Sequence, residues 1–375
     1  MGAGTTTAGP QTAHGGASAS SAKTFTDMAA EAIDRVWAEP LQAKALAVEA
    51  QAGARREGDA TALSMAEHAL GLVAYEQQDL NGSLAHLRRA IEVAQRNGLA
   101  ICEAQARRSI MGTLAHLGDL RGALREADWA APALRGAELA RLEVHRGQVL
   151  VYEGRLDEAS ACFRHALPVL RRAGDRLWLA LAYWDRSYLH FRRGDLAAAE
   201  ADLRRAEALH VELGLHRYAT IDLQHLAILA ARRGDVPSAL SLFDEAEAYF
   251  AERGEVDSIG MYDRCESLLA ARLTTDLRET AERAIAALEA EGRRGYVAEV
   301  RLMLAEAALL AGDPATARVA ADRARRAFSR QGRPTFVALA RHLSVRAAWL
   351  AGDRSTALLA AARKAAAGLA EAGFA

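Results

Sequence analysis

Apolar and polar residues follow one another along most of the chain with the spacing of α-helices. Within a typical segment, small or apolar residues recur at i, i+4 and i+7, as in Ala199, Leu203 and Ala206. This spacing places the three side chains on one face of a helix. No segment has the alternating pattern of a half-buried strand. We therefore predict an all-α fold.

A short turn motif recurs eight times, about every 40 residues, between two helical segments. The motif is a Gly-Asp-like pair, found at Gln78-Asp79, Gly118-Asp119, Gly154-Arg155, Gly194-Asp195, Gly234-Asp235, Thr275-Asp276, Gly312-Asp313 and Gly352-Asp353. Glycine readily adopts the left-handed conformation that ends a helix, and an Asp side chain caps the free N–H groups that begin the next one. Each motif thus predicts a turn between two helices.

A small residue four positions after each turn predicts where the two helices of a pair approach closely. These residues are Ser83, Ala123, Ala159, Ala199, Ala239, Thr280, Ala317 and Ala357. A second, softer set of turns separates the pairs, at Gly58-Asp59, Asn97-Gly98, Gly174-Asp175, Gly214, Gly254, Gly292 and Gly332. Residues 26 to 38 and 41 to 57 form a ninth, less regular pair at the front. Because one pair cannot cover its own apolar face, the pairs are expected to stack in sequence.

Composition supports a helical protein with an apolar core. Of the 375 residues, 51% are hydrophobic and 25% are charged. The formal net charge of -1 gives no long-range field to gather phosphates, so direct nucleic-acid binding is disfavoured. The three separated cysteines suit a reducing cytoplasm. Since neither a membrane-spanning apolar run nor a secretory signal occurs in the sequence, we expect a cytoplasmic location without a membrane partner.

The repeat resembles the tetratricopeptide repeat, a helix-turn-helix unit. The resemblance rests on Leu70-Gly71 with Tyr75, on Gly147 with Tyr152, and on the Gly-Asp turn followed by Ala, an aromatic residue and Ala. The chain departs from the family in its period, which is nearer 40 residues than about 34, and in lacking the first-helix glycine in most units. The resemblance implies a right-handed α-solenoid of about eight to nine repeats.

Two further expectations concern the ends of the chain. Residues 1–24 are rich in Gly, Ala, Ser and Thr, and predict a disordered low-complexity leader before a solenoid over residues 25–375. The chain closes on a second helix and the glycine of an inter-repeat turn, without a capping helix. This favours a solenoid truncated at its C-terminal end, where an uncapped Ala-rich face would promote self-association.

The sequence gives little support for catalysis. Cys162 and His165 come nearest to a nucleophile beside a base. However, Cys162 lies next to a packing position and His165 is expected to face solvent, so we expect a structural role for Cys162, and likewise for Cys102 and Cys265. The sequence has no H-E-x-x-H, paired C-x-x-C, phosphate-loop or dinucleotide-binding pattern. We therefore expect no enzyme activity, no cofactor and no bound metal.

Binding of a protein or peptide is the remaining function. In tetratricopeptide solenoids the first helix of each pair lines the concave groove, and this implies a groove position for the aromatic stripe Trp184, Tyr188 and Phe191. Beside it lie side chains with hydrogen-bond donors for a peptide backbone or carboxylate: Arg108, Gln148, Tyr152, Arg192, Gln224 and Arg232. An aromatic stripe with helical spacing is also typical of a core, so groove surface and core both stay open for these residues.

Several units are also similar in sequence to the repeat region of actinobacterial CHAT proteins, in which the repeats precede a caspase-like Cys-His peptidase domain. The similarity rests on residues 131–136, 167–178 and 329–334, and would cover residues 26–375. It implies that the array is the sensor or docking arm of a protease whose catalytic domain is outside this chain. Two alternatives stay open: a stand-alone adaptor, and the ligand-sensing arm of a bacterial transcription regulator.

Overall fold

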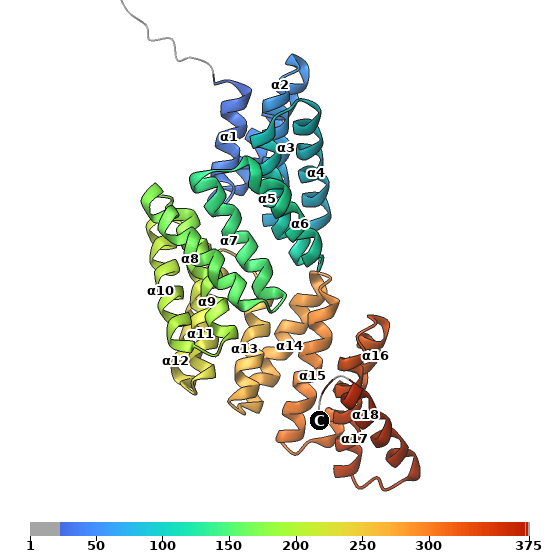
Figure 1. Cartoon of the computed structure of the whole chain (residues 1–375). Helices are drawn as coiled ribbons and strands as arrows, with labels where there is room; N and C mark the ends of the chain where they lie inside the picture. Colours follow the sequence, from blue (N-terminus) through green and yellow to red (C-terminus); the bar gives the residue numbers. More distant parts are fainter. Residues whose placement is uncertain (1–22, 372, 374–375) are drawn as a thin grey trace, which may run out of the picture. The chain divides into compact units, whose positions relative to one another are not determined.

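The structure is a computed structural model that describes residues 23–371 and 373 (Figure 1). These residues form eighteen α-helices and one short 3-10 helix, and no strand occurs among them. The prediction of an all-α solenoid of paired helices is therefore confirmed. Most of the predicted leader lies outside the described residues. Its last residue, Thr24, caps the first helix by accepting a hydrogen bond from the backbone N–H of Asp27.

The helices fall into two compact units, which meet in the sequence at the turn between Gly118 and Asp119. The first unit contains α1 (Phe25–Arg35), α2 (Pro40–Glu57), α3 (Ala60–Glu76), α4 (Leu80–Arg96) and α5 (Ala100–His116). Successive helices in this unit pack as antiparallel neighbours. The predicted front pair thus corresponds to α1 and α2.

The second unit contains the rest of the repeats. Its first helices are α7 (Gly136–Tyr152), α9 (Arg176–Arg192), α11 (His216–Arg232), α13 (Ser258–Ala270), α15 (Arg294–Leu310) and α17 (Pro334–Leu350). Its second helices are α6 (Leu120–Ala130), α8 (Leu156–Ala173), α10 (Leu196–Glu212), α12 (Val236–Ala251), α14 (Thr274–Ala290), α16 (Pro314–Arg330) and α18 (Thr356–Glu371), with the 3-10 helix η1 (Ala131–Ala133) after α6.

Most of the predicted caps are confirmed. Five Asp side chains accept a hydrogen bond from the backbone N–H three residues ahead: Asp79, Asp119, Asp195, Asp235 and Asp313. At the Gly154-Arg155 turn no side-chain cap forms at the start of α8, since an Arg side chain has no acceptor oxygen. One predicted Asp cap, that of Asp353, was wrong. At the start of α18, Ser355 Oγ rather than Asp353 accepts from the N–H of Leu358, at 3.1 Å.

The turn predicted at Thr275-Asp276 was also wrong, because it lies three residues earlier. Both residues are inside α14, and the residue with left-handed backbone is Arg272, with φ 58°. The turn has an arginine where the other turns mostly have glycine, so the Gly-Asp pattern is absent there. The nearby Thr275-Asp276 pair resembles that pattern and gives the wrong position for the turn. Counted from the observed turn, the residue four positions after it is Leu277, which is fully buried together with Ala281 and Ala284. The predicted Thr280 is also buried, at 4% exposure, but it lies three residues further from the turn than its counterparts do.

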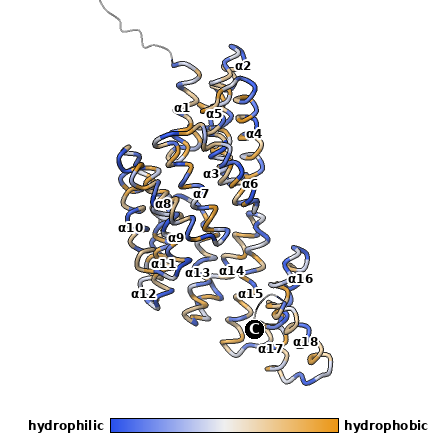
Figure 2. The backbone as a smooth tube through the Cα atoms, in the orientation of Figure 1, coloured by the Kyte–Doolittle hydropathy of each residue, from blue (hydrophilic) through white to orange (hydrophobic). Residues whose placement is uncertain are grey.

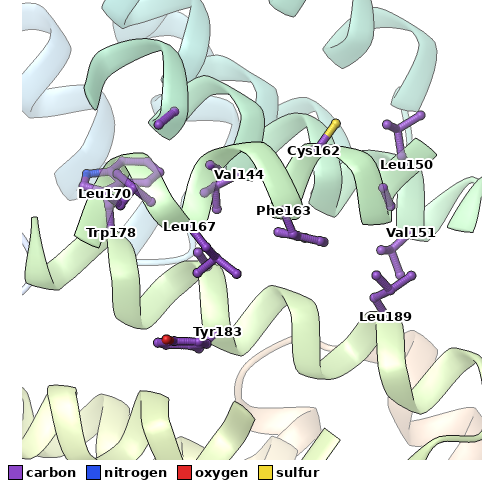
Figure 3. Packing of buried hydrophobic residues seen from close by; sticks show 14 of the residues in the cluster. Val144, Leu150, Val151, Cys162, Phe163, Leu167, Leu170, Trp178, Tyr183 and Leu189 are labelled. Atoms are coloured by element: carbon purple, nitrogen blue, oxygen red, sulfur yellow. The ribbon is translucent and has the colours of Figure 1, made fainter. Parts of the chain in front are cut away.

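Apolar side chains from facing helices form the core of each unit. Hydrophobic and hydrophilic residues are interspersed along the helices (Figure 2). In the second unit one cluster joins Phe163 and Leu167 of α8 with Val144 of α7 and Leu189 of α9 (Figure 3). Gly147 makes room for this packing, since a Cβ atom there would lie 2.8 Å from Cζ of Phe163. This core underlies the surface on which the predicted site residues lie.

Candidate functional site

The first helices α7, α9 and α11 carry a connected group of aromatic and arginine side chains, which we call the aromatic–arginine face. Its members are Tyr152, Trp184, Tyr188, Phe191, Arg192 and Arg232. The ring of Tyr188 lies 5.9 Å from that of Tyr152, edge to face, and 6.2 Å from that of Phe191, stacked. The guanidinium of Arg192 lies 5.9 Å from the Tyr188 ring, and that of Arg232 lies 5.8 Å from the Phe191 ring. The structure thus brings six sequence-predicted residues together.

Exposure divides the face into two kinds of side chain. The four aromatic rings are half-buried, whereas Arg192 and Arg232 are exposed. Trp184 packs against the core clusters on both sides of α9 and lies 5.1 Å from the ring of His225. Trp184, Tyr188 and Phe191 pack against core clusters and, like Tyr152, remain partly exposed. The two arginines therefore lie against a partly apolar surface.

Two of the predicted donors are not accessible. Arg108 in the first unit is 5% exposed and Gln224 in the second is 6% exposed. The Gln224 side chain donates a hydrogen bond to Asp257, the residue that caps α13. Gln148 behaves similarly, since its Nε2 donates to Asp185 Oδ1 at 2.9 Å. Successive first helices lie close enough for a long polar side chain to reach the next repeat, so these amides hold the solenoid together rather than face a groove.

Asp185 is a residue that sequence reasoning missed. It lies on α9 beside the aromatic–arginine face and is only 7% exposed. Burial raises the pKa of this carboxyl to about 8, although the hydrogen bond from Gln148 acts in the opposite direction. Burial and the nearby Asp185 also raise the pKa of the Tyr152 phenol. At neutral pH the carboxyl of Asp185 and the phenol of Tyr152 are therefore neutral, and the charges of the face are those of Arg192 and Arg232. The only signal in the sequence was that Asp185 stands one helical turn from Tyr188.

The cysteine environments fit the structural role expected for them. Cys162 is buried on α8, and burial raises the pKa of its thiol to about 12, so the thiol stays protonated and unreactive. His165 is exposed on the same helix. Burial also raises the pKa of the Cys265 thiol to about 12.

Over residues 23–371, no group of three His, Cys, Asp or Glu side chains is arranged to hold a metal ion. None of the helices in that range is long and apolar enough to cross a bilayer.

Comparison with known proteins agrees with the repeat architecture. Residues 138–210, which run from α7 to α10, match the family model of the tetratricopeptide repeat. No curated protein matches the chain in sequence.

Solved structures share the fold at low sequence identity. A STAND signal-transduction ATPase from Pyrococcus horikoshii with a tetratricopeptide repeat sensor aligns with a TM-score of 0.67 at 11% identity, over 88% of this chain and 52% of that one. The chain therefore spans about half the length of that protein. A Rap protein complexed with competence and sporulation factor aligns with a TM-score of 0.63 at 16% identity, over 82% of this chain and 86% of that one.

A third solved structure shows the same likeness. The Rap conjugation gene regulator of plasmid pLS20, in complex with the Phr* peptide, aligns with a TM-score of 0.57 at 14% identity, over 83% of this chain and 96% of that one. Identities this low establish the fold and nothing finer. Together with the match at residues 138–210, they identify the described chain as an α-solenoid built from tetratricopeptide-type helix pairs.

Proposed function

We propose that this chain is a non-catalytic, peptide- or protein-binding repeat array, and that its partner is held on the aromatic–arginine face of α7, α9 and α11. The observation that carries the proposal is the cation–ring pairing on this face, with Arg192 over Tyr188 and Arg232 over Phe191. A guanidinium fixed against a ring keeps its outward N–H groups available for a carboxylate or a peptide carbonyl. The half-buried rings offer apolar contact area at little cost in side-chain entropy.

The predicted partner-binding set changes under this proposal. The contact surface keeps five members of that set, which all belong to the aromatic–arginine face: Tyr152, Trp184, Tyr188, Arg192 and Arg232. Gln148 supports the surface indirectly, through its hydrogen bond to Asp185. Arg108 and Gln224 are buried and do not belong to the contact surface. The proposed partner is thus a peptide segment with a carboxylate and at least one apolar side chain.

Structural neighbours support the general class of partner. The two Rap proteins were solved with competence and sporulation factor and with the Phr* peptide, and the STAND protein has a tetratricopeptide repeat sensor. Each resembles this chain in fold, so ligand capture by the repeat array is the function that this architecture most readily supports.

A peptide selection tests the proposal. Peptides are selected on the purified chain from a displayed library of random sequences, and the affinity of one enriched peptide is measured by calorimetry. The double substitution Trp184→Ala and Arg192→Ala should weaken binding by about a hundredfold, because two central anchors of about 1.4 kcal/mol each are lost. Helicity should stay unchanged by circular dichroism.

The matched control removes a similar pair elsewhere. Arg354 lies 3.5 Å from the ring of the exposed Trp349, so Trp349→Ala with Arg354→Ala deletes the same two residue types at the end of α17. Affinity should stay within about twofold of wild type in this control. Equal loss in both double variants, or unfolding of the first one alone, would contradict the assignment of the face.

A finer proposal concerns the protein that the array serves. We propose a sensor or docking arm for a CHAT-type caspase-like protease, supported by the similarity of residues 131–136, 167–178 and 329–334 to that family's repeats. The likeness to a STAND protein with a repeat sensor favours an alternative, the ligand-sensing arm of a transcription regulator. A stand-alone cytoplasmic adaptor is the third arrangement. In all three the array itself binds protein or peptide, not nucleic acid, membrane or cofactor.

The mass of the native protein separates these arrangements. An immunoblot or intact-mass measurement should detect a species far above 40.2 kDa if the array serves an effector domain. Cleavage of a bound partner by that species would support the protease arrangement, and DNA binding would support the regulator. A native mass of 40.2 kDa would leave the adaptor, and turnover by the purified array alone would contradict the non-catalytic proposal.

A further inference from the structure

A pocket of about 210 Å³ lies between α11, α12 and α13. Phe243, Phe250, Val256 and Met261 provide its apolar lining. Polar side chains also border it: Gln224, Glu247, Glu255, Asp257 and Arg264. The pocket is separate from the aromatic–arginine face, and it exists because of a local irregularity in the repeat.

The irregularity is a shortened first helix. α13 has 13 residues, whereas α9, α11, α15 and α17 each have 17. Residues 252–257, between α12 and α13, form a non-helical connector. Aligned at the turn that follows each first helix, Arg272 corresponds to Gly234, and residues 254–257 then correspond to the missing first turn of α13. The pocket lies beside this missing turn.

In the neighbouring repeats an aromatic ring fills this place. The third residue of the first helix is Trp178 in α9, Tyr218 in α11, Tyr296 in α15 and Phe336 in α17. Each ring contacts another ring on a preceding helix. The distances between centroids are 5.1 Å for Trp178–His145, 5.5 Å for Tyr218–His210, 5.0 Å for Tyr296–Tyr262 and 4.9 Å for Phe336–Phe328. In the α13 repeat the corresponding residue is Val256, whose side chain is 61% exposed.

The surface that such a ring would cover is still present. His210 and Phe328, which pack on Tyr218 and Phe336, are each the fifteenth residue of their second helix. The fifteenth residue of α12 is Phe250, which lines the pocket and is 4% exposed. The repeat therefore retains one ring of the pair and lacks the other. The Phe250 ring is contacted instead by the Arg217 guanidinium, at 5.2 Å, and by the ring of Tyr249, at 5.3 Å.

We propose that this pocket binds an aromatic ring that carries an N–H or O–H donor, namely the indole or phenol of a Trp or Tyr side chain in a partner peptide. Its volume suits one ring system, since an apolar cavity of about 150 Å³ can take benzene and pockets for larger ligands begin near 300 Å³. A peptide source rests on the proposed function. The specificity for an aromatic ring is independent of the proposed function, because it follows from the missing ring at Val256.

The polar border explains the preference for a ring with a donor. Asp257 already accepts from the backbone N–H of Gly260 at 3.0 Å, Glu255 is paired with Arg217, and Glu247 is paired with Arg264 and Arg283. Each carboxylate has about four lone-pair positions, so each can accept one more hydrogen bond. Glu247, Glu255 and Arg264 are already in ion pairs, and Asp257 is held by two neutral donors, Gln224 and the N–H of Gly260. A neutral N–H or O–H on the ring can therefore be accepted at this border without breaking an ion pair.

Binding of two fluorinated probes to the full chain tests the proposal. The probes are 5-fluoroindole and the blocked amino acid N-acetyl-5-fluorotryptophanamide, each titrated against the protein and observed by ¹⁹F NMR. Both should bind saturably at one site. Val256→Trp supplies the missing ring from the chain itself, so it should weaken both probes by about tenfold or more. Phe250→Leu, which matches Leu170 at the same place in α8, should weaken them while keeping the fold.

Val319→Trp is the matched control, because Val319 is 53% exposed on α16 and lies outside the pocket lining. It should leave both affinities unchanged. Binding of 5-fluoroindole alone would overturn the assignment to a peptide side chain. Saturable binding of neither probe, or binding that survives Val256→Trp, would overturn the pocket itself. None of these outcomes depends on the aromatic–arginine face, so failure here is distinct from failure of the proposed function.

Discussion

The carboxyl group of Asp185 on α9 accepts a hydrogen bond from Nε2 of Gln148 on α7, at a distance of 2.9 Å. The bond joins the first helices of two successive repeats directly beside the proposed binding face. Asp185 is 7% exposed, and burial raises its pKa to about 8. The contact between these two helices therefore depends on whether the Asp185 carboxyl is protonated.

Replacing Asp185 with Asn should change how stability depends on pH. The pKa of this carboxyl is raised in the folded state above about 3.9 in the unfolded chain, so the folded state holds the proton more tightly. Its contribution to stability is complete below pH 4 and is lost as the pH rises to about 8. The melting temperature of Asp185→Asn relative to wild type should therefore increase between pH 5 and pH 8 in thermal denaturation.

Asp157→Asn is the control for this measurement, because the Asp157 side chain is fully exposed and pairs only with Arg193 at the surface. Its melting temperature should follow that of wild type across the same pH range. Parallel curves for Asp185→Asn and wild type would show that Asp185 is ionised in the folded protein, against the expectation.

The repeat was predictable because its signals are local. A glycine that ends one helix and an Asp that caps the next act within a few residues, so five Asp caps could be placed without knowledge of the tertiary structure. The turn at Arg272 was missed because an arginine, and not a glycine, has the left-handed backbone there.

The site was only partly predictable, for a different reason. The aromatic–arginine face follows helical spacing within α9, so its rings could be found from the sequence. The burial of Gln224 and Asp185 depends on how closely successive first helices approach, and no pattern within one helix contains that distance. The missing ring at Val256 is a difference between the third residues of successive first helices, so the sequence of one repeat alone does not contain it.

Two glycine substitutions in first helices should have opposite effects. In Gly147→Ala the new methyl group would lie 2.8 Å from Cζ of the fully buried Phe163, so we expect a loss of about 1–3 kcal/mol in the free energy of unfolding. Gly295 on α15 has open space around the added Cβ atom. Gly295→Ala should therefore gain about 0.5–1 kcal/mol from helix propensity. Urea denaturation measures both, and a gain in both variants would argue against close packing of α7 on α8.

Arg272→Gly should stabilise the turn between α13 and α14. Arg272 has φ 58°, where an L side chain costs about 1–2 kcal/mol, and the corresponding residue in the preceding repeat is glycine. Part of the gain is lost to the greater freedom of glycine in the unfolded chain, so we expect about 0.5–1 kcal/mol of net stabilisation. Arg193→Gly is the comparison, since Arg193 has ordinary helical backbone and should lose stability instead. A lower melting temperature for Arg272→Gly would mean that the arginine side chain contributes more than its backbone costs.

His210 and Asp222 form a buried pair where the preceding repeat has only apolar residues. His210 Nδ1 lies 2.7 Å from Asp222 Oδ2, and both residues are 1% exposed. The corresponding residues one repeat earlier are Leu170 and Ala182, also buried. Burial raises the pKa of Asp222 to about 6, although the bond to His210 acts in the opposite direction. The pair therefore carries a cost of desolvation that an apolar pair in the same place does not.

Removing one member of this pair should harm the protein more than removing both. Asp222→Ala leaves a buried imidazole without its partner and should cost about 3 kcal/mol or more, whereas the double variant His210→Leu with Asp222→Ala should lie within about 1 kcal/mol of wild type or above it. A double-mutant cycle followed by urea denaturation measures the coupling between His210 and Asp222 directly. Additive losses would mean that His210 and Asp222 act independently. A double variant weaker than either single one would mean that the Leu–Ala packing of the preceding repeat does not transfer, because the neighbouring Tyr218 ring requires the imidazole.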